Sequence, residues 1–291
     1  MAGPESTFIQ VFLGVIGACV GSFINVVAFR LPRECMSLSR PRSRCPRCAA
    51  PIRWHENIPV LSWLILRGRC RACGCSISPR YPLVEALTAL LFVLTARLML
   101  PAGAFEAPLD HGQEWLRVGL ACVITAALLV LSLIDLDYRI LPDEITKSGI
   151  VLGSLMAFLA PGLQPTPVIG GFFPEGASPR VVALVHGLLG AATGMGALWT
   201  IGYLGSKAFR KPAMGLGDVK MIGAMGAVLG FWVFLALAVA AVAGGLIGGV
   251  LRLVAGARYI PFGPFLALGM WSVMVGGEPI LRFYLGLVTR T

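Results

Sequence analysis

The sequence predicts an all-α polytopic membrane protein of about eight transmembrane helices, with a small zinc-ribbon-like loop domain on the cytoplasmic side. Hydrophobic residues make up 57% of the 291 residues and charged residues only 13%, about half of the roughly 25% that is usual in soluble domains. The apolar residues are gathered in separate runs of near-spanning length. Four cysteines in two Cys-x-x-Cys pairs lie between the first two runs.

The apolar runs give the expected spans. The first run has 22 residues, about 33 Å of helix at roughly 1.5 Å per residue, which is enough to cross a bilayer. It lacks a basic n-region and a small-residue cleavage site, so we expect a retained span.

His186 in the fifth run is expected to be a hydrogen-bonded polar residue. The tail after residue 275 contains charged residues and is expected at the membrane interface. The expected spans are residues 8–29, 83–100, 116–134, 144–159, 181–204, 219–237, 238–254 and 260–275.

The basic residues predict which side of the membrane the loops face. The net charge is +10, and residues 30–80 hold eleven arginines against Glu34 and Glu56. Arginine between spans marks the cytoplasmic side and faces anionic lipid headgroups. Residues 101–115 carry acidic side chains and no lysine or arginine, as expected on the outer side. The sequence therefore predicts membrane lipid, and not nucleic acid, as the partner of this charge.

The cysteine pairs predict a metal centre in the loop of residues 30–81. This loop is too short for a good hydrophobic core of its own. Cys45-Pro-Arg-Cys48 and Cys70-Arg-Ala-Cys73 are 21 residues apart, close to zinc-ribbon spacing. Four thiolates close a tetrahedral shell, so the zinc would be structural. A redox dithiol is the alternative, and Cys75, outside the two pairs, is not expected to bind.

Two acidic segments predict a pair of aspartates that could act together in catalysis. Asp135 ends the third span, and Asp218 begins the sixth in Gly215-Leu-Gly-Asp218; by the span count both reach the cytoplasmic face. Two neighbouring carboxylates share a proton and can act as an aspartyl dyad. Asp218 alone could equally be a helix cap. Gly215 and Gly217 are expected to admit a substrate backbone, and Asp143 to cap the helix that follows it.

Taken in order, these motifs resemble those of the bacterial type IV prepilin peptidases, also called prepilin leader peptidase/N-methyltransferases. These are membrane aspartyl proteases of the Gly-x-Gly-Asp type. The resemblance covers nearly the whole chain. It comprises Gly21–Val27 with Arg30–Pro32, the four cysteines, Glu56–Ser62, Arg80–Glu85, Ile134–Asp137 with Leu141–Asp143, Gly215–Lys220 and Ile260–Pro264.

The resemblance implies two activities at the cytoplasmic face of the bacterial inner membrane. Asp135 and Asp218 would be the catalytic pair that removes the leader peptide from prepilins or pseudopilins, serving type IV pili or type II secretion. Methylation of the new N-terminus by S-adenosylmethionine would belong to the loop of residues 30–81, where Gly68 and Arg69 match a family motif of glycine, basic residue and cysteine. Residues 1–29 would be the first transmembrane helix, and residues 82–291 the peptidase domain.

Three other interpretations stay open at this point. A peptidase without methyltransferase activity is disfavoured by the retained cysteine loop. A transporter with acidic ion sites would have internal repeats and charges at mid-membrane, whereas Asp135 and Asp218 lie at a boundary. A zinc-loop assembly platform would need no aspartate pair. No glycine-rich nucleotide fingerprint marks a methyl-donor site, and the oligomeric state has no signal in the sequence.

Overall fold

The computed structural model describes residues 4–33, 43–165, 173–174, 176–211, 214–256 and 260–288. Every regular element in these ranges is a helix, apart from two isolated β-bridges, Arg44 with Pro51 and Arg69 with Ser76. The chain divides into two units. The first comprises residues 1–118 and 122–130, and the second comprises residues 119–121 and 131–291. The predicted all-helical fold class is confirmed.

The first unit is built on two long helices, α1 (Pro4–Arg30) and α3 (Arg80–Met99), which pack against each other. Asn25 of α1 donates hydrogen bonds to the carbonyl oxygens of Gly21 and Tyr81, so the amide has partners on both helices. Farther along α3, a hydrophobic core joins it to α4 (Gly112–Tyr138). Its buried members are Phe92, Ala96, Leu100, Ala104, Val118 and Cys122.

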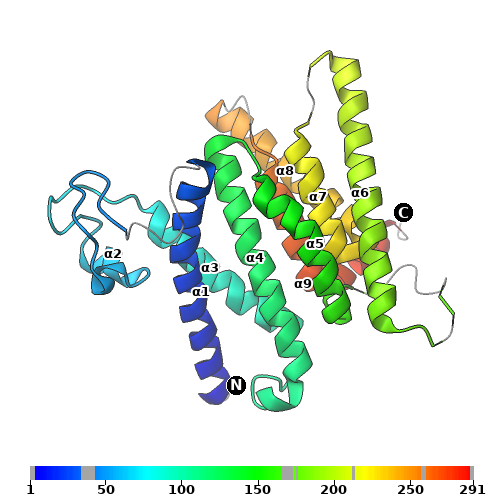
Figure 1. Ribbon diagram of the computed structural model, residues 1–291, viewed down its shortest axis with the longest axis horizontal. Coiled ribbons are helices and arrows are strands. Elements are labelled where there is room, and N and C mark those ends of the chain that lie inside the picture. The colour runs from blue at the N-terminus through cyan, green and yellow to red at the C-terminus, as the bar shows by residue number, and fades with distance from the viewer. Residues whose placement is uncertain are drawn as a thin grey trace. The chain divides into compact units, whose positions relative to one another are not determined.

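The second unit is organised around α7 (Leu216–Leu229), which contacts α5 (Asp143–Leu159) and α6 (Pro179–Phe209), as Figure 1 shows. Nearly every residue of α7 from position 221 onward is buried. The C-terminal end of α4 belongs to this unit, together with α8 (Val233–Ala255) and α9 (Gly263–Val288). The central position of α7 explains why the residues at its start are held in place by several neighbours.

Helices occupy all eight predicted positions, but the number of spans is not confirmed. Six helical stretches in the described residues are long and apolar enough to cross a membrane. They are Ser6–Arg33, Arg80–Met99, Pro108–Tyr138, Pro179–Phe209, Leu216–Val254 and Gly263–Arg282. α5 has only 17 residues and is not among them, and the predicted sixth and seventh spans fall in the single stretch from Leu216 to Val254.

The predicted boundary between the sixth and seventh spans, at residues 237–238, is wrong. The break lies at Gly230–Trp232, where a 3-10 turn separates α7 from α8. His186 of α6 is fully buried there. Its Nε2 accepts a hydrogen bond from the Phe231 amide (3.2 Å), and its Nδ1 lies 3.0 Å from Gln164 Oε1. The expectation that His186 is a hydrogen-bonded polar residue is confirmed, and its ring satisfies a backbone amide that the interrupted helix leaves free.

The last helix has a kink where the eighth span was expected to end. Gly276 in α9 has non-helical dihedral angles (φ −154°, ψ 31°), and Pro279 follows within the helix. A proline removes one helical hydrogen bond and clashes with the preceding turn. The helix continues beyond this point to Val288, so the chain after residue 276 is helical.

Candidate active site and metal centre

Asp135 is held by the start of another helix. It lies near the C-terminal end of α4 and is 7% exposed. Its Oδ2 accepts a hydrogen bond from the amide of Gly263 (2.8 Å), the first residue of α9. The first amides of a helix have no partner within it and favour negative charge. A Cβ atom on Gly263 would lie 2.6 Å from the same oxygen. Only glycine allows this approach, and sequence reasoning missed this residue although it lies in the Ile260–Pro264 motif.

Asp218 lies in the first turn of α7, whose N-cap is Gly215. Its carboxylate accepts a hydrogen bond from the Gly215 amide and interacts electrostatically with Asp135. The bond to the N-cap amide is the one that an acidic residue of a capping box makes. The two interpretations of Asp218 are therefore compatible: it closes the start of a helix, and it lies near enough to Asp135 for their charges to interact. The structure brings together the two aspartates that the sequence paired.

Gly217 has a different role from the predicted one. A Cβ atom there would lie 3.0 Å from the Cβ of Leu141, so the missing side chain lets the segment after α4 pack on the start of α7. At Gly215 the nearest atom to such a Cβ is Asp218 Oδ2, at 3.5 Å. Packing thus accounts for Gly217, and access of a substrate backbone at Gly215 stays a prediction.

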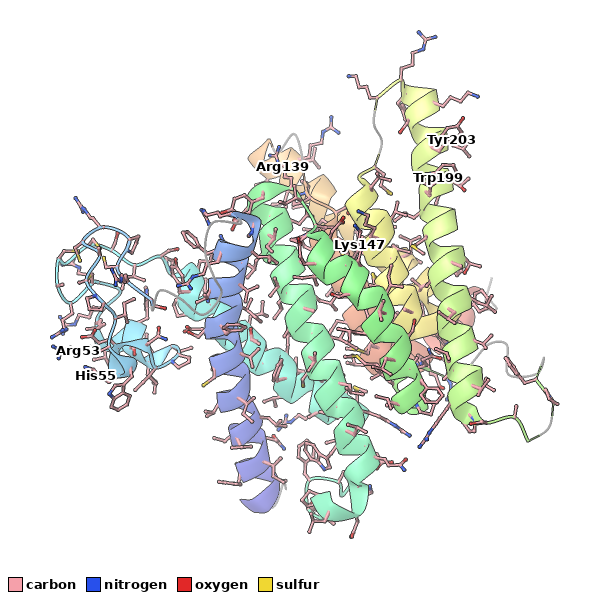
Figure 2. The ribbon with its side chains drawn as sticks, viewed as in Figure 1. Arg53, His55, Arg139, Lys147, Trp199 and Tyr203 are labelled. Carbon is pink, nitrogen blue, oxygen red and sulfur yellow. The ribbon has the colours of Figure 1, made fainter. Side chains whose placement is uncertain are left out.

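The prediction that Asp143 caps a helix is wrong. α5 begins at Asp143 itself, and its N-cap is Pro142, with no side-chain capping bond. Asp143 instead pairs with Lys147 Nζ (2.6 Å) and with Lys220 Nζ. Two ammonium groups give a carboxylate stronger partners than a backbone amide does. Figure 2 shows Lys147 on α5, and because Lys220 belongs to α7, Asp143 ties the starts of these two helices together.

The four predicted metal ligands lie in two turns with the same backbone hydrogen bonds. In the first turn the Cys45 amide donates to Ala50 O (2.9 Å) and the Ala49 amide to Cys45 O (2.9 Å). The second turn, 25 positions later, has the equivalent bonds from Cys70 to Cys75 O and from Gly74 to Cys70 O, both 2.8 Å. Residues 44–51 and 69–76 thus form an internal repeat, which the sequence analysis missed because the two segments share few residues.

The cysteine geometry fits a tetrahedral metal. The Sγ atoms of Cys45, Cys48, Cys70 and Cys73 all lie within 4.8 Å of one another, and those of Cys45 and Cys73 are 3.8 Å apart. Zinc–sulfur bonds of about 2.3 Å require roughly this separation. Cys75 Sγ lies 3.6 Å from Cys45 Sγ, so its exclusion as a ligand stays a prediction.

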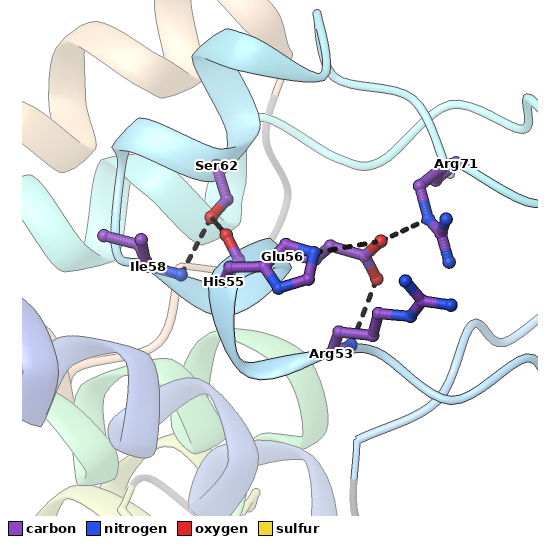
Figure 3. A network of polar contacts seen from close by, with 6 residues as sticks. All are labelled: Arg53, His55, Glu56, Ile58, Ser62 and Arg71. Carbon is purple, nitrogen blue, oxygen red and sulfur yellow. Dashed lines mark hydrogen bonds and ion pairs between the residues drawn. The ribbon is translucent and has the colours of Figure 1, made fainter.

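A polar network connects the second cysteine turn to the segment that precedes it (Figure 3). The Glu56 carboxylate accepts a hydrogen bond from the Arg53 amide (3.0 Å) and pairs with Arg71. Arg71 lies between Cys70 and Cys73. Ser62 Oγ donates to His55 O (3.0 Å) and accepts from the Ile58 amide (2.8 Å). The network fixes residues 53–62 as one compact piece.

Glu85 fastens this piece to the membrane helices of the same unit. It lies near the start of α3, is 8% exposed, and accepts a hydrogen bond at Oε2 from the Val60 amide (2.7 Å). Val60 has φ +62°, an unusual backbone conformation for a β-branched residue. The hydrogen bond from a buried carboxylate helps to hold the backbone in that conformation.

Of the two predicted methyl-donor residues, Gly68 and Arg69, Gly68 has a local structural role. Gly68 has φ +65°, and a Cβ atom there would lie 2.8 Å from the Trp63 ring. Its amide donates to Trp63 O (2.8 Å) and its carbonyl accepts from the Ile77 amide (2.7 Å). Both backbone groups of Gly68 are therefore used inside the loop, which argues against Gly68 as a direct ligand of a methyl donor. Arg69 is exposed.

Two family descriptions match the chain. Residues 15–99 match the bacterial peptidase A24 N-terminal domain, and residues 122–249 match the type IV leader peptidase family. Curated relatives called prepilin leader peptidase/N-methyltransferase include one from Myxococcus xanthus, which is 40% identical over 90% of this chain and 68% of the relative. Those from Aeromonas salmonicida and Neisseria gonorrhoeae are 35% and 32% identical, over 98% and 95% of this chain and 96% and 94% of the relatives. No solved structure matches the chain.

Proposed function

The chain belongs to the type IV leader peptidase family, and on that premise we propose which of its residues perform the family's two reactions. The protein removes the leader peptide from type IV prepilins or pseudopilins, and it methylates the N-terminal residue that cleavage exposes. The observation that carries the proposal is the pairing of Asp135 with Asp218. These residues come from different helices and interact through their charges.

In the cleavage reaction, the two aspartates share one proton because two adjacent carboxylates do not both ionise readily. The ionised carboxylate takes a proton from a water molecule, and the resulting nucleophile attacks the carbonyl carbon of the scissile peptide bond. The protonated carboxyl group donates its proton to the carbonyl oxygen. When the tetrahedral intermediate collapses, the leaving amine is protonated and the aspartate pair returns to its first state. The Gly263 amide fixes one oxygen of Asp135 and leaves the other for the water.

Methylation is assigned to the loop of residues 30–81. S-adenosylmethionine supplies the methyl group, and the α-amine of the mature substrate is the nucleophile. Cys45, Cys48, Cys70 and Cys73 would hold a zinc ion that closes the loop and takes no part in the chemistry. Of the two residues in the expected donor region, Arg69 is retained as a candidate contact, while Gly68 acts through its packing on Trp63.

The protein is placed in the bacterial inner membrane as a multi-pass enzyme. We assign the cysteine loop and both aspartates to the cytoplasmic side, because the arginines of residues 30–80 mark that side. Cleavage there would expose the new amine in the compartment that contains the methyl donor. A transporter is disfavoured, because paired carboxylates at helix ends match a hydrolytic site better than a mid-membrane ion site.

The test follows cleavage and methylation together. Purified protein in lipid vesicles is incubated with a prepilin and S-adenosylmethionine labelled in its methyl group. Asp135→Asn and Asp218→Asn should each lower cleavage by about a thousandfold or more, as removal of one member of a catalytic set does. Both variants should still methylate a synthetic peptide with the mature N-terminus. Asp137→Asn, two positions from Asp135, is the matched control. Normal cleavage by either variant would overturn the assignment.

A further inference from the structure

The cysteine loop exposes a set of large apolar side chains. Trp54 is 82% exposed, Ile58 39%, Leu61 55%, Leu64 57% and Ile65 76%. We call these five residues the apolar patch. They fall within twelve positions of a loop whose other exposed residues are mostly polar or basic. Apolar side chains gathered in this way on a polar domain usually mark a surface that contacts something else.

The short helix α2 (Leu61–Ile65) is turned with its apolar side outward. Ser62 is buried, and Trp63 packs against Gly68 and donates from Nε1 to Ile77 O (3.0 Å). The outward positions 61, 64 and 65 are spaced by three and four residues, as on one face of a helix. The polar and hydrogen-bonded contacts of α2 thus point into the loop, and its free face consists of leucine and isoleucine.

The patch is attached to the end of a membrane-spanning helix. The Val60 amide, between Ile58 and Leu61, is bonded to Glu85, which is the sixth residue of α3. α3 is one of the helices long and apolar enough to cross a membrane. The first turns of α3 expose Tyr81, Leu83 and Leu87 (44%, 66% and 45%), which would face lipid. The bond to Glu85 therefore holds the patch at the level where α3 enters the bilayer.

The exposed charges around the patch are positive, since Glu56 is mostly buried and pairs with Arg71. Arg53 precedes it, and Arg67 and Arg69 follow it; all three are exposed. Figure 2 shows Arg53 beside His55 on this part of the loop. Exposed leucine, isoleucine and tryptophan flanked by arginine are typical of segments that lie in the interface of an anionic membrane.

We propose that the apolar patch inserts into the interfacial layer of the membrane and that the flanking arginines bind anionic lipid headgroups. The partner is the lipid surface itself, because the patch is bonded near the start of a membrane helix and the arginines beside it match the charge of anionic lipid. The binding does not depend on the enzymatic activity. Its consequence rests on the proposed function: the methyl-transfer loop is kept beside the membrane, where the substrate's hydrophobic segment also lies.

Photo-cross-linking identifies the partner directly. A photoreactive phenylalanine analogue replaces Ile65, and the protein is reconstituted in vesicles of phosphatidylethanolamine and phosphatidylglycerol. We expect lipid adducts at position 65 without any substrate, and several-fold fewer when the analogue replaces Ala72, an exposed residue of the second cysteine turn. Adducts only to a second copy of the protein, or only after prepilin is added, would overturn the proposal.

Two variants separate the apolar and ionic contributions, with the analogue placed at position 64. Leu61→Ser with Ile65→Ser should lower lipid adducts several-fold while zinc content is unchanged, and Leu109→Ser, at a leucine that is 95% exposed elsewhere in the unit, should have no effect. Arg53→Gln with Arg67→Gln should reduce the preference for phosphatidylglycerol over phosphatidylcholine vesicles by roughly fivefold per arginine. Adduct yields that neither pair changes would contradict the proposal.

Discussion

The cysteine loop and the aspartate pair differ in how far apart along the chain their parts lie. Each cysteine turn is closed by hydrogen bonds between residues at most five positions apart. Asp135 is held by an amide 128 positions away, and Asp218 comes from a third helix. A local motif can form its metal site wherever the chain places it. The aspartate pair exists only when three helix ends meet, so distant changes should damage it more easily.

The largest effect is expected from removing the metal. Cys45→Ser with Cys70→Ser should abolish zinc binding, because a structural zinc site contributes about 10 kcal/mol or more to folding. The loop of residues 30–81 should then be digested rapidly by protease and methylation should be lost. Leader cleavage should stay within about twofold of the wild type. Zinc analysis and the two activities measured on one preparation provide the check, and Cys122→Ser in α4 is the control. Equal loss of both activities would show that the two regions are not independent.

A single methyl group at Gly263, 128 positions from Asp135 along the chain, should displace the Asp135 carboxylate. Gly263→Ala places Cβ against Asp135 Oδ2, so the carboxylate must move and cleavage should fall by about a hundredfold. Methylation of a mature peptide should be unchanged. Gly245→Ala, at a position in α8 where a Cβ would meet nothing within 4 Å, is the matched control. Wild-type kcat and KM for Gly263→Ala would refute the role assigned to its amide.

Removing the Asp143–Lys220 ion pair should slow cleavage less than the Gly263 substitution does. Both side chains are partly exposed (42% and 32%), and ion pairs of this kind are weak. Asp143→Asn and Lys220→Met should each slow cleavage by roughly threefold, and the double variant should be no slower than either single one. Kinetics of all four proteins complete the cycle. Strictly additive losses would mean that the two residues act separately.

Glu56 should make the stability of the cysteine loop depend on pH. Its pKa is lowered by the hydrogen bond from the Arg53 amide and by the charge of Arg71. A lowered pKa means that the ionised group stabilises the fold above its unfolded value, and that this contribution is lost as the pH falls through the folded value. Glu56→Gln should therefore speed proteolysis of the loop at neutral pH. The difference from wild type should persist down to about pH 4 and shrink below it. A difference that grows on acidification would contradict the assignment.

The smallest effects are expected within the repeat itself. Ala49 and Gly74 occupy equivalent left-handed positions, with φ 56° and 69°. Ala49→Gly should stabilise the first turn and Gly74→Ala should destabilise the second, each by about 1 kcal/mol. Chelator titrations that measure zinc release give the comparison. Shifts of the same sign in both variants would show that the two turns are not equivalent.

The fold class and the family could be predicted from the sequence, and the structure and the comparisons confirm both. Apolar run length specifies a membrane helix almost by itself. The break at Gly230 was missed because the residues around it are as apolar as those in the helices. The left-handed conformation of Gly230 and the His186 ring, which comes from another helix and accepts the Phe231 amide, both depend on packing that the local sequence does not reveal.

The candidate site was predicted only in part, because some of its residues interact with partners that are far away along the chain. The cysteine cluster follows from spacing alone, and the geometry fits it. The partnership of Asp135 and Asp218 required an argument about the sides of the membrane, and their catalytic role stays a prediction. Asp143 was predicted to cap the helix that follows it, because its partner Lys220 is 77 positions away and was not considered. Gly263 was not assigned to the site at all. Residues that act across helices cannot be found from local patterns.

The position of Gly263 has a consequence for biosynthesis. The amide that holds Asp135 is translated 128 positions after it, and α9 must then insert before the two can bond. A chain that stops after α8 contains both aspartates but lacks this support. The newly made protein should therefore acquire proteolytic activity only once α9 has entered the membrane.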